Sequence, residues 1–390
     1  MKRVFSCLLL FCFLFSGITV YAQKGKNIIA ENNAGYLKEL ESNAESLYLV
    51  ECKTGEVLYK YNETKEASLA SVTKIMTLLL VMEAIEEGKI SLDETVTVSE
   101  YASSMGGSQV YLKEGELMSV DELIKCTVIA SANDAAVALA ERVSGSESIF
   151  VSEMNKRAKD LGMQNSNFEN VTGLDDTTEN HYSSAMDIAI MSQELIKHER
   201  ILKYSSLWQD TIRDGAFTLT NTNRLVRFYE GCNGLKTGST DKAGFCISAS
   251  AKRGDMQLVA VVMGAKTRDV RNSTAKALLD YGFANYSIFK SGENIFYKDL
   301  SVRFGAKDSI DIYSSEFYAL IPKGNDKYVN VKYEYPEYLT SPIKEGDVIG
   351  KTKYYLNDTL LGEGELFVKE SIEKIGFFDI LFKIFSSIIS

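Results

Sequence analysis

The residues with the clearest chemical potential are a serine and a lysine three positions apart. The motif Ser71-Val72-Thr73-Lys74 stands where a polar stretch meets the apolar run IMTLLLVMEAI. Residues three apart share a face of a helix, so we expect the Lys74 amine to lie beside the Ser71 hydroxyl. A neutral lysine can act as the base that turns a serine into a nucleophile. Burial and a nearby cation would lower the Lys74 pKa, and the helix N-terminus would favour a developing oxyanion.

The spacing alone is weak evidence, and the alternative for Ser71 is a helix N-cap. What distinguishes this copy is that it alone opens a long apolar helix. Ser-x-x-Lys occurs at five or more positions, beginning at Ser71, Ser239, Ser287, Ser341 and Ser371.

A second motif, Ser131-Ala132-Asn133, interrupts two helical patterns and is the one Ser-x-Asn of the chain. Its alternative role is to stop one helix and cap the next. In a catalytic role, the Ser131 hydroxyl would relay a proton and the Asn133 amide would hold a peptide carbonyl.

The third motif, Lys236-Thr237-Gly238, precedes a predicted strand over 243–250. Lys236 and Thr237 offer a cation and a hydroxyl suited to a terminal carboxylate, and Gly238 would let a substrate backbone approach closely. The alternative is a turn with a solvated lysine. The same three letters at 53–55 lie in the turn of a hairpin predicted over 46–62, where Gly55 supplies turn geometry.

The remaining pattern predicts how these motifs are held. Strands are expected near both ends of the first domain, within 46–62 and 244–265. This order favours an α+β fold, an antiparallel sheet flanked by helices with a helical subdomain inserted. Helical periodicity covers 72–87, 120–130, 133–144, 150–161 and 184–198.

A second domain is indicated by composition. All three prolines are late, at 322, 336 and 342, and the segment from 292 to 368 alternates as half-buried strands do. We therefore predict a domain over 23–288 and a small β-sandwich over 289–370.

Both ends of the chain carry apolar segments. Residues 1–22 start with Lys2 and Arg3, continue uncharged and end Val-Tyr-Ala, which is typical of a secretory signal peptide; an uncleaved membrane anchor is the alternative. Residues 371–390 are expected to form an amphipathic helix. From Ile375 it would be about 24 Å long, too short to cross a bilayer, so it would lie in the membrane surface. The alternative is a helix packed on its own domain.

Composition excludes several classes of function. The net charge of −10, without a dense Lys/Arg tract, argues against a nucleic-acid partner. Only two histidines are present, at 181 and 198, so His-based metal motifs are missing and a Ser-His-Asp triad is poorly supported. No metal or other cofactor is expected. Four cysteines would remain after signal cleavage, and they are read as buried thiols, with a Cys232–Cys246 bridge as the alternative.

The order of the three motifs resembles that of the penicillin-recognising serine enzymes. Over nearly its whole length the chain is similar to the low-molecular-weight penicillin-binding proteins, which are serine D-alanyl-D-alanine carboxypeptidases with a penicillin-binding/β-lactamase-like fold. Further stretches that carry the resemblance are SMGGSQVYL, HYSSAMDIA, KTGSTDKAG and VMGAKT.

The resemblance implies a role for each site residue. Ser71 would attack the bond between two terminal D-alanines, Lys74 would take its proton, and Ser131 would pass a proton to the leaving amine. Asn133 would hold the substrate amide, Thr237 the terminal carboxylate, and Lys236 would supply positive potential. Gly238 belongs to the same strand motif. The N–H groups of Ser71 and Ser239 would form the oxyanion hole. Arg271 stands where relatives carry an arginine near the carboxylate, and Arg268 competes with it for this role.

The resemblance also implies partners and location. The substrate would be a peptidoglycan stem peptide ending in D-Ala-D-Ala, β-lactams would inhibit covalently, and the protein would be exported to the outer face of the cytoplasmic membrane. One alternative is a class A β-lactamase, but Glu169 is followed four residues later by Gly173 rather than asparagine. A catalytically silent wall-binding protein is another alternative, and endopeptidase action on cross-linked D-alanyl bonds stays open.

Overall fold

The computed structural model describes residues 35, 37–176, 178–292, 294–376, 381 and 385. These residues group into two compact units that meet in sequence between Asn285 and Tyr286. They are called the first domain and the second domain below, and each is described by itself.

The first domain is built on an antiparallel sheet with strand order β2-β1-β9-β8-β7. Both predicted hairpins are confirmed: β1 pairs with β2 around the turn that contains Gly55, and β8 pairs with β9 around Gly254. The five strands are β1 (Ser46–Glu51), β2 (Val57–Tyr61), β7 (Cys232–Thr240), β8 (Gly244–Arg253) and β9 (Met256–Ala265).

Helices fill the chain between β2 and β7, as the inserted-subdomain pattern predicts, and a long helix follows β9. The helical elements are η1 (Glu41–Asn43), η2 (Ala70–Thr73), α2 (Lys74–Glu86), α3 (Glu100–Ser103), α4 (Val120–Lys125), η3 (Cys126–Ala130), α5 (Asn133–Ser144), α6 (Glu147–Asp160), α7 (Ala185–Lys197), α8 (Glu199–Ser205), α9 (Leu225–Phe228) and α10 (Arg268–Asn285). Two small hairpins lie among them, β3 (Thr95–Thr97) with β4 (Leu117–Ser119), and β5 (Gln209–Ile212) with β6 (Phe217–Thr220).

The two helices next to the predicted catalytic serines, Ser71 and Ser131, differ from the prediction. The first is not one α-helix over 72–87, because Ser71 lies in the 3-10 turn η2 and the α-helix begins at Lys74. The second is α-helical only to Lys125 and continues as the π-helical turn η3. Such local irregularities are frequent at functional sites.

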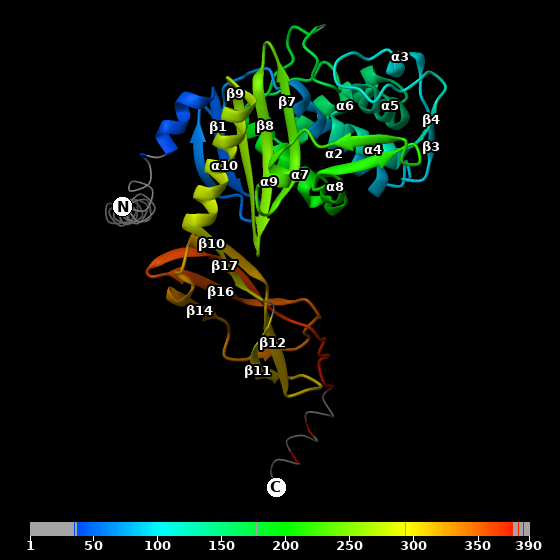
Figure 1. Cartoon of the computed structure of the whole chain (residues 1–390). Coiled ribbons are helices and arrows are strands. Elements are labelled where there is room, and N and C mark those ends of the chain that lie inside the picture. The colour runs from blue at the N-terminus through cyan, green and yellow to red at the C-terminus, as the bar shows by residue number, and fades with distance from the viewer. Residues whose placement is uncertain are drawn as a thin grey trace, which may run out of the picture. The chain divides into compact units, whose positions relative to one another are not determined.

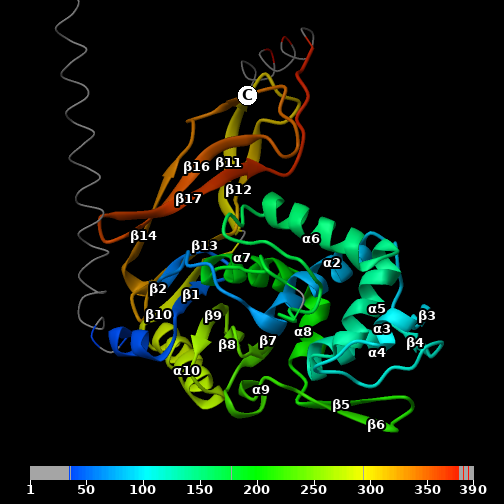
Figure 2. The same cartoon turned by 90° about the horizontal axis from the view of Figure 1, so that it is seen from above.

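The sheet is covered on both faces, and its central strand β9 is accordingly apolar. Figure 2 shows α10 on one face of the sheet and α7 on the other, and β9 is buried along nearly its whole length. Figure 1 shows α2 among the other helices of the inserted subdomain, beyond β7.

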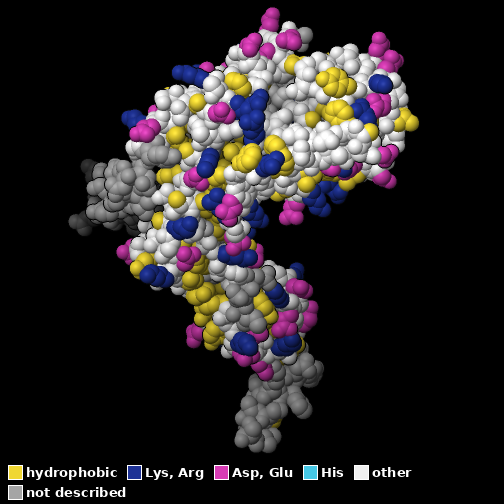
Figure 3. All heavy atoms as spheres, viewed as in Figure 1, with side chains coloured by type: hydrophobic (Ala, Val, Ile, Leu, Met, Phe, Trp, Pro, Cys, Tyr) yellow, Lys and Arg dark blue, Asp and Glu magenta, His cyan; other side chains and the backbone are white. Residues whose placement is uncertain are grey.

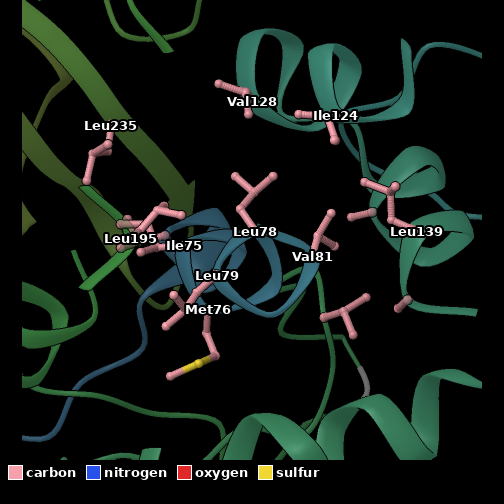
Figure 4. Packing of buried hydrophobic residues seen from close by; sticks show 14 of the residues in the cluster. Ile75, Met76, Leu78, Leu79, Val81, Ile124, Val128, Leu139, Leu195 and Leu235 are labelled. Carbon is pink, nitrogen blue, oxygen red and sulfur yellow. The ribbon is translucent and has the colours of Figure 1, made fainter. Parts of the chain in front are cut away.

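Helix α2 runs through the centre of the core. Nine of its 13 residues are buried, and Figure 4 shows its leucine, isoleucine and valine side chains facing neighbouring helices and β7. Each fully buried aliphatic side chain of this kind contributes about 1.5–3 kcal/mol of transfer free energy. The first residue of this apolar helix is Lys74, so the same packing that stabilises α2 buries its amine.

The second domain is made of strands, as predicted. A six-stranded sheet has the order β14-β16-β17-β12-β11-β15, and β10 pairs with β13 in a second sheet. The two sheets meet through aromatic rings: Phe317 of β13 stacks on Tyr354 of β16, with ring centroids 4.0 Å apart. The elements are β10 (Tyr286–Ser291), β11 (Asn294–Arg303), β12 (Ser309–Ser314), β13 (Phe317–Pro322), η4 (Asp326–Tyr328), β14 (Val329–Glu334), β15 (Leu339–Thr340), β16 (Val348–Leu356) and β17 (Thr359–Val368).

The segment expected to be a C-terminal helix begins differently. Ile372 and Lys374 form β-bridges with Ile343 and Gly305, so residues 371–376 are extended and belong to the second domain. The expected start of the helix at 371 is therefore wrong, because the backbone of Ile372 and Lys374 already pairs with Ile343 and Gly305. Within residues 377–390, the structure describes Leu381 and Phe385, which are helical and exposed. The other residues of this segment, and the predicted signal peptide, lie outside the described residues. No helix in the described ranges has the length and apolarity needed to cross a membrane.

The cysteines of the described chain are free thiols, as the main prediction has it. The alternative Cys232–Cys246 bridge does not form. Although the two residues lie on adjacent strands, Cys232 stands opposite Ala251 and Cys246 opposite Gly238, so the register keeps them apart.

Candidate active site

The predicted nucleophile and base are in contact. The Lys74 amine is completely buried, and Nζ lies 3.1 Å from Ser71 Oγ. It also donates to Asn133 Oδ1 at 2.6 Å and to the Thr172 carbonyl at 2.8 Å. These last two oxygens can only accept. A neutral amine has two N–H groups and one lone pair, so satisfying both acceptors leaves the lone pair for the Ser71 hydroxyl.

The neutral form of Lys74 is the one its surroundings favour. Burial lowers its pKa well below the ordinary value of 10.5, the charge of Lys236 lowers it further, and Asp134 opposes both. Desolvation penalises the ammonium, and a neighbouring cation does the same. The arrangement therefore makes a base next to a serine hydroxyl.

Ser131 and Lys236 form a second hydroxyl–amine pair. Lys236 Nζ donates to Ser131 Oγ at 2.7 Å and to the Thr237 carbonyl at 3.1 Å. Ser131 ends η3 in the left-handed region, with φ 63°, which turns the chain into α5 and brings its side chain to the β7 edge. Burial, and then the charge of Arg271, lower the Lys236 pKa to about 7. This amine can thus exchange a proton with Ser131 near neutral pH.

Asn133 lies at the start of α5 and connects Lys74 to a neighbouring loop. Its Oδ1 accepts from Lys74, and its Nδ2 donates to the Gly106 carbonyl at 2.7 Å. Its backbone N–H donates to the Ser108 carbonyl at 2.7 Å. The Gly-rich stretch 104–109 is therefore held to the same residue that orients the base.

The Lys-Thr-Gly strand passes directly beside the nucleophile. A Cβ at Gly238 would lie 2.7 Å from the Ser71 backbone nitrogen and 2.9 Å from the Leu69 carbonyl. The glycine is thus required because the protein's own backbone approaches it closely. The prediction that the substrate backbone makes this approach is replaced by that contact. Thr237 Oγ1 donates to Thr222 Oγ1 at 2.9 Å, and Ser239 is exposed.

Arg271 lies in the first turn of α10 and is buried beside β8, the strand that pairs with β7. Its guanidinium donates to the Cys246 carbonyl at 3.4 Å and to Asn272 Oδ1 at 2.9 and 3.0 Å. Burial, followed by the charge of Arg268, lowers its pKa to about 10, so it remains cationic at neutral pH.

Most of these residues line one cleft with a volume of about 590 Å³, but Asn133 is buried and does not line it. Polar and cationic side chains dominate its lining. They include Ser71, Ser131, Thr237, Gly238, Ser239, Arg268 and Arg271, with Ser108, Trp208, Thr220, Asn221, Thr222, Arg224 and Phe228. Lys74 and Lys236 lie behind its wall, each within hydrogen-bond reach of a lining serine.

The loop that supports the base was not predicted from the sequence. Besides the Thr172 carbonyl, this loop supplies Gly173, at φ +81°, where a Cβ would lie 1.8 Å from the Ala70 carbonyl. Asn170 Oδ1 accepts from the Gly173 N–H at 2.6 Å and shapes the turn. Asp175 then accepts from Ser68 Oγ at 2.7 Å and from Thr240. The Asn-x-x-Gly spacing was the available signal, but nothing local indicates what its carbonyl faces.

Neither histidine bonds to Ser71. His181 is buried, and desolvation lowers its pKa to about 4, so it is neutral. Its Nδ1 accepts from the Glu169 N–H at 3.0 Å, which leaves Nε2 as the donor to Thr73 Oγ1 at 2.8 Å. His198 contacts Glu86. Glu169 itself accepts from the N–H groups of Glu179 and Asn180, so it is bound within its own loop.

Within the described residues, no three His, Cys, Asp or Glu side chains are close enough to hold a metal ion. The described donors are instead hydroxyls, amines and guanidiniums, a set suited to acyl transfer on a substrate that carries a carboxylate.

Comparison with known proteins agrees with this chemistry. Residues 32–267 match the family model described as D-alanyl-D-alanine carboxypeptidase, and residues 283–374 match the C-terminal domain of penicillin-binding protein 5. The chain is 41% identical to D-alanyl-D-alanine carboxypeptidase DacF of Bacillus subtilis, over 98% of this chain and 97% of that protein.

The chain belongs to the D-alanyl-D-alanine carboxypeptidase family.

Solved structures of this family extend the comparison. Penicillin-binding protein 5 of Haemophilus influenzae is 33% identical with a TM-score of 0.73, covering 85% of this chain and 98% of that one. Penicillin-binding protein D2 of Listeria monocytogenes, in its ampicillin-bound form, is 33% identical with a TM-score of 0.57, covering 62% of this chain and 98% of that one. The resemblance to penicillin-recognising carboxypeptidases stated from the motifs is thereby confirmed, and so is the α+β domain followed by a β-rich domain.

Proposed function

We propose that this D-alanyl-D-alanine carboxypeptidase releases the terminal D-alanine of peptidoglycan stem peptides through an acyl-enzyme on Ser71. The observation that carries the proposal is a completely buried Lys74 amine 3.1 Å from the Ser71 hydroxyl, in surroundings that lower the pKa of the amine. The family supplies the reaction class, and the contacts of the Ser71–Lys74 and Ser131–Lys236 pairs support the roles of these four residues.

In the acylation step, the Lys74 lone pair takes the Ser71 proton while Oγ attacks the carbonyl of the penultimate D-alanine. The tetrahedral oxyanion is stabilised by the N–H groups of Ser71 and Ser239; each such donor contributes about 3–4 kcal/mol. Thr237 and Arg271 hold the terminal carboxylate, and Asn133 holds the substrate amide. Lys236 keeps the potential of the cleft positive.

Collapse of the intermediate breaks the peptide bond. Ser131 passes its proton to the departing D-alanine amine and takes up the proton that Lys74 removed from Ser71, which leaves Lys74 neutral again. Lys236 donates to Ser131 Oγ at 2.7 Å and, with a pKa of about 7, assists this exchange. Water then attacks the ester, with Lys74 again as base, and releases the shortened peptide and Ser71.

A pentapeptide ending in D-Ala-D-Ala tests the assignment. Purified protein should release D-alanine, and Ser71→Ala should abolish release; unchanged release by that variant would refute the role of Ser71. Benzylpenicillin provides an independent test, because a β-lactam carbonyl should acylate the same oxygen. Mass mapping of the labelled peptide should place the adduct on Ser71, and an adduct on another residue would contradict the proposal.

We also propose that the protein acts outside the cytoplasm, with residues 1–22 removed as a signal peptide and the end of the chain lying on the membrane surface. The described residues of this segment support the surface anchor. Leu381 and Phe385 are helical and exposed, and because they are four residues apart they lie on one face of the helix. Deleting 377–390 leaves the strand-paired residues 371–376 in place and should move the protein to the soluble fraction. A deletion variant that stays membrane-bound with a processed N-terminus would disprove the anchor.

A further inference from the structure

One end of the cleft carries more positive charge than a single terminal carboxylate requires. Arg224, Arg268 and Arg271 all line the cleft; they are called the arginine end below. Arg224 precedes α9, and the other two lie one turn apart at the start of α10. In the space-filling view, dark blue side chains lie beside hydrophobic ones over the sheet of this domain (Figure 3).

Within the described chain, the arginine end has no carboxylate partner. Arg224 and Arg268 are exposed and form no ion pair there, and the described acceptors of Arg271 are neutral oxygens of Cys246 and Asn272. The charges of Arg268 and Arg224 both lower the Arg271 pKa, with Asp269 opposing them. Three guanidiniums that line one cleft give this end a positive potential, which favours anions.

The position of the arginine end relative to the nucleophile fixes which part of a substrate it faces. Arg271 donates to the carbonyl of Cys246, which stands opposite Gly238 in the sheet register. Thr237 bonds to Thr222, two residues before Arg224. The arginines therefore surround the Thr237 end of the site, where the terminal residue of the substrate lies when its carboxylate is bound. That residue is the one that leaves.

We propose that Arg224 and Arg268 bind a second carboxylate, carried by the leaving residue itself. This inference rests on the proposed function, in which Thr237 and Arg271 hold the terminal carboxylate. The substrate class is a peptide whose leaving D-amino acid is dicarboxylic. Trp208 and Phe228 give this end an apolar wall, with ring centroids 6.2 Å apart, against which the methylene groups of such a side chain would pack.

Three peptides that differ only in the last residue test the proposal: diacetyl-L-Lys-D-Ala followed by D-Ala, D-Gln or D-Glu. D-Gln and D-Glu have the same shape, so the ratio of their kcat/KM values isolates the second carboxylate. We expect wild type to favour D-Glu over D-Gln by about fivefold or more at low salt, with the preference falling as ionic strength rises. Arg268→Gln and Arg224→Gln should each reduce the ratio several-fold.

Lys276→Gln is the matched control, because it removes one exposed cation from α10 without touching the cleft; it should keep the wild-type ratio. A ratio near one in wild type, or a preference that survives both arginine substitutions, overturns the proposal. If none of the three peptides is cleaved, the proposed function fails instead. Calorimetric binding of the D-Gln and D-Glu peptides to Ser71→Ala then still decides the inference, since the expected preference is one of binding.

Discussion

The chain contains Lys-Thr-Gly twice, and the two copies have different roles. In the turn after β1, Lys53 is exposed, Thr54 bonds to Glu51 at 2.9 Å, and Gly55 adopts φ +70° with open space around it. In β7 the lysine is buried against Ser131, the threonine bonds across the cleft to Thr222, and a Cβ on the glycine would lie 2.7 Å from the Ser71 nitrogen.

The difference lies in what surrounds each side chain. The first glycine is required for its backbone conformation, the second for the space it leaves. Burial lowers the pKa of the second lysine to about 7, which a solvated ammonium would not show. Identical residues thus serve a turn in one place and acyl transfer in the other, and paired substitutions at the two copies can separate these roles.

Removing the lysines should give the largest contrast. Lys236→Ala should reduce kcat/KM for D-alanine release by about 10²–10⁴-fold, because Ser131 loses its proton partner and the cleft loses a cation. Lys53→Ala should change it by less than about twofold, as expected of a surface position. Steady-state kinetics on the pentapeptide measures both, and equal losses would contradict the assignment of the β7 copy.

Adding a methyl group at each glycine should give the next largest contrast. Gly238→Ala forces β7 or the Ser71 backbone to move, and a displacement of this size costs about 100-fold in turnover. Gly55→Ala should leave turnover unchanged but lower the free energy of unfolding by about 1–2 kcal/mol, because its φ is left-handed. Kinetics and urea unfolding on both variants distinguish these outcomes. Full activity in Gly238→Ala would show that the strand does not fix Ser71.

The threonines should differ by a smaller factor. Thr237→Val keeps the shape of the side chain but removes the hydroxyl offered to the terminal carboxylate, so kcat/KM should fall about tenfold. Thr54→Val removes the bond to Glu51 and should lower the free energy of unfolding by about 1 kcal/mol without affecting kinetics. If Thr237→Val binds and cleaves the pentapeptide normally, the carboxylate is held elsewhere.

The last prediction concerns the dependence of stability on pH. Folded Lys236 has a pKa of about 7 against an ordinary 10.5, so between these values the unfolded chain binds a proton that the folded chain lacks. This group's contribution to stability therefore rises with pH across that window. Lys236→Met lacks this pH-dependent contribution. Its Tm minus the wild-type Tm should therefore become less positive, or more negative, between pH 7 and about pH 9.5. The same Tm comparison for Lys53→Met shows how much the loss of any lysine changes the pH dependence. A Tm difference at Lys236 that stays constant with pH would mean that the pKa of its amine is not lowered.

Much of the scaffold was predictable because it follows from local pattern. Runs of strand-forming residues on either side of turn residues predicted both hairpins of the sheet. The helical spacing of apolar residues predicted α5 with its observed bounds, Asn133–Ser144. The order of three motifs was enough to predict the reaction class. The supporting loop was missed because Thr172 contributes a backbone carbonyl, and any residue type could provide one there.

Local pattern also failed where pairing partners lie far away in sequence. Residues 371–376 are predicted to belong to a helix whose apolar face begins at Ile375, yet Ile372 and Lys374 pair with Ile343 and Gly305. Bridge pairing satisfies the backbone groups of these two residues as well as a helix would, and only the fold brings their partners close.

By itself, the sequence determined which residue types are available and in what order, since side-chain chemistry and short-range periodicity are properties of the chain. The tertiary structure alone decided which amines lose their water. Lys74 lies 2.8 Å from a carbonyl 98 positions away, and Lys236 lies 2.7 Å from a hydroxyl 105 positions away. A pKa depends on solvation and on nearby charges, and both are set by segments that only folding brings together.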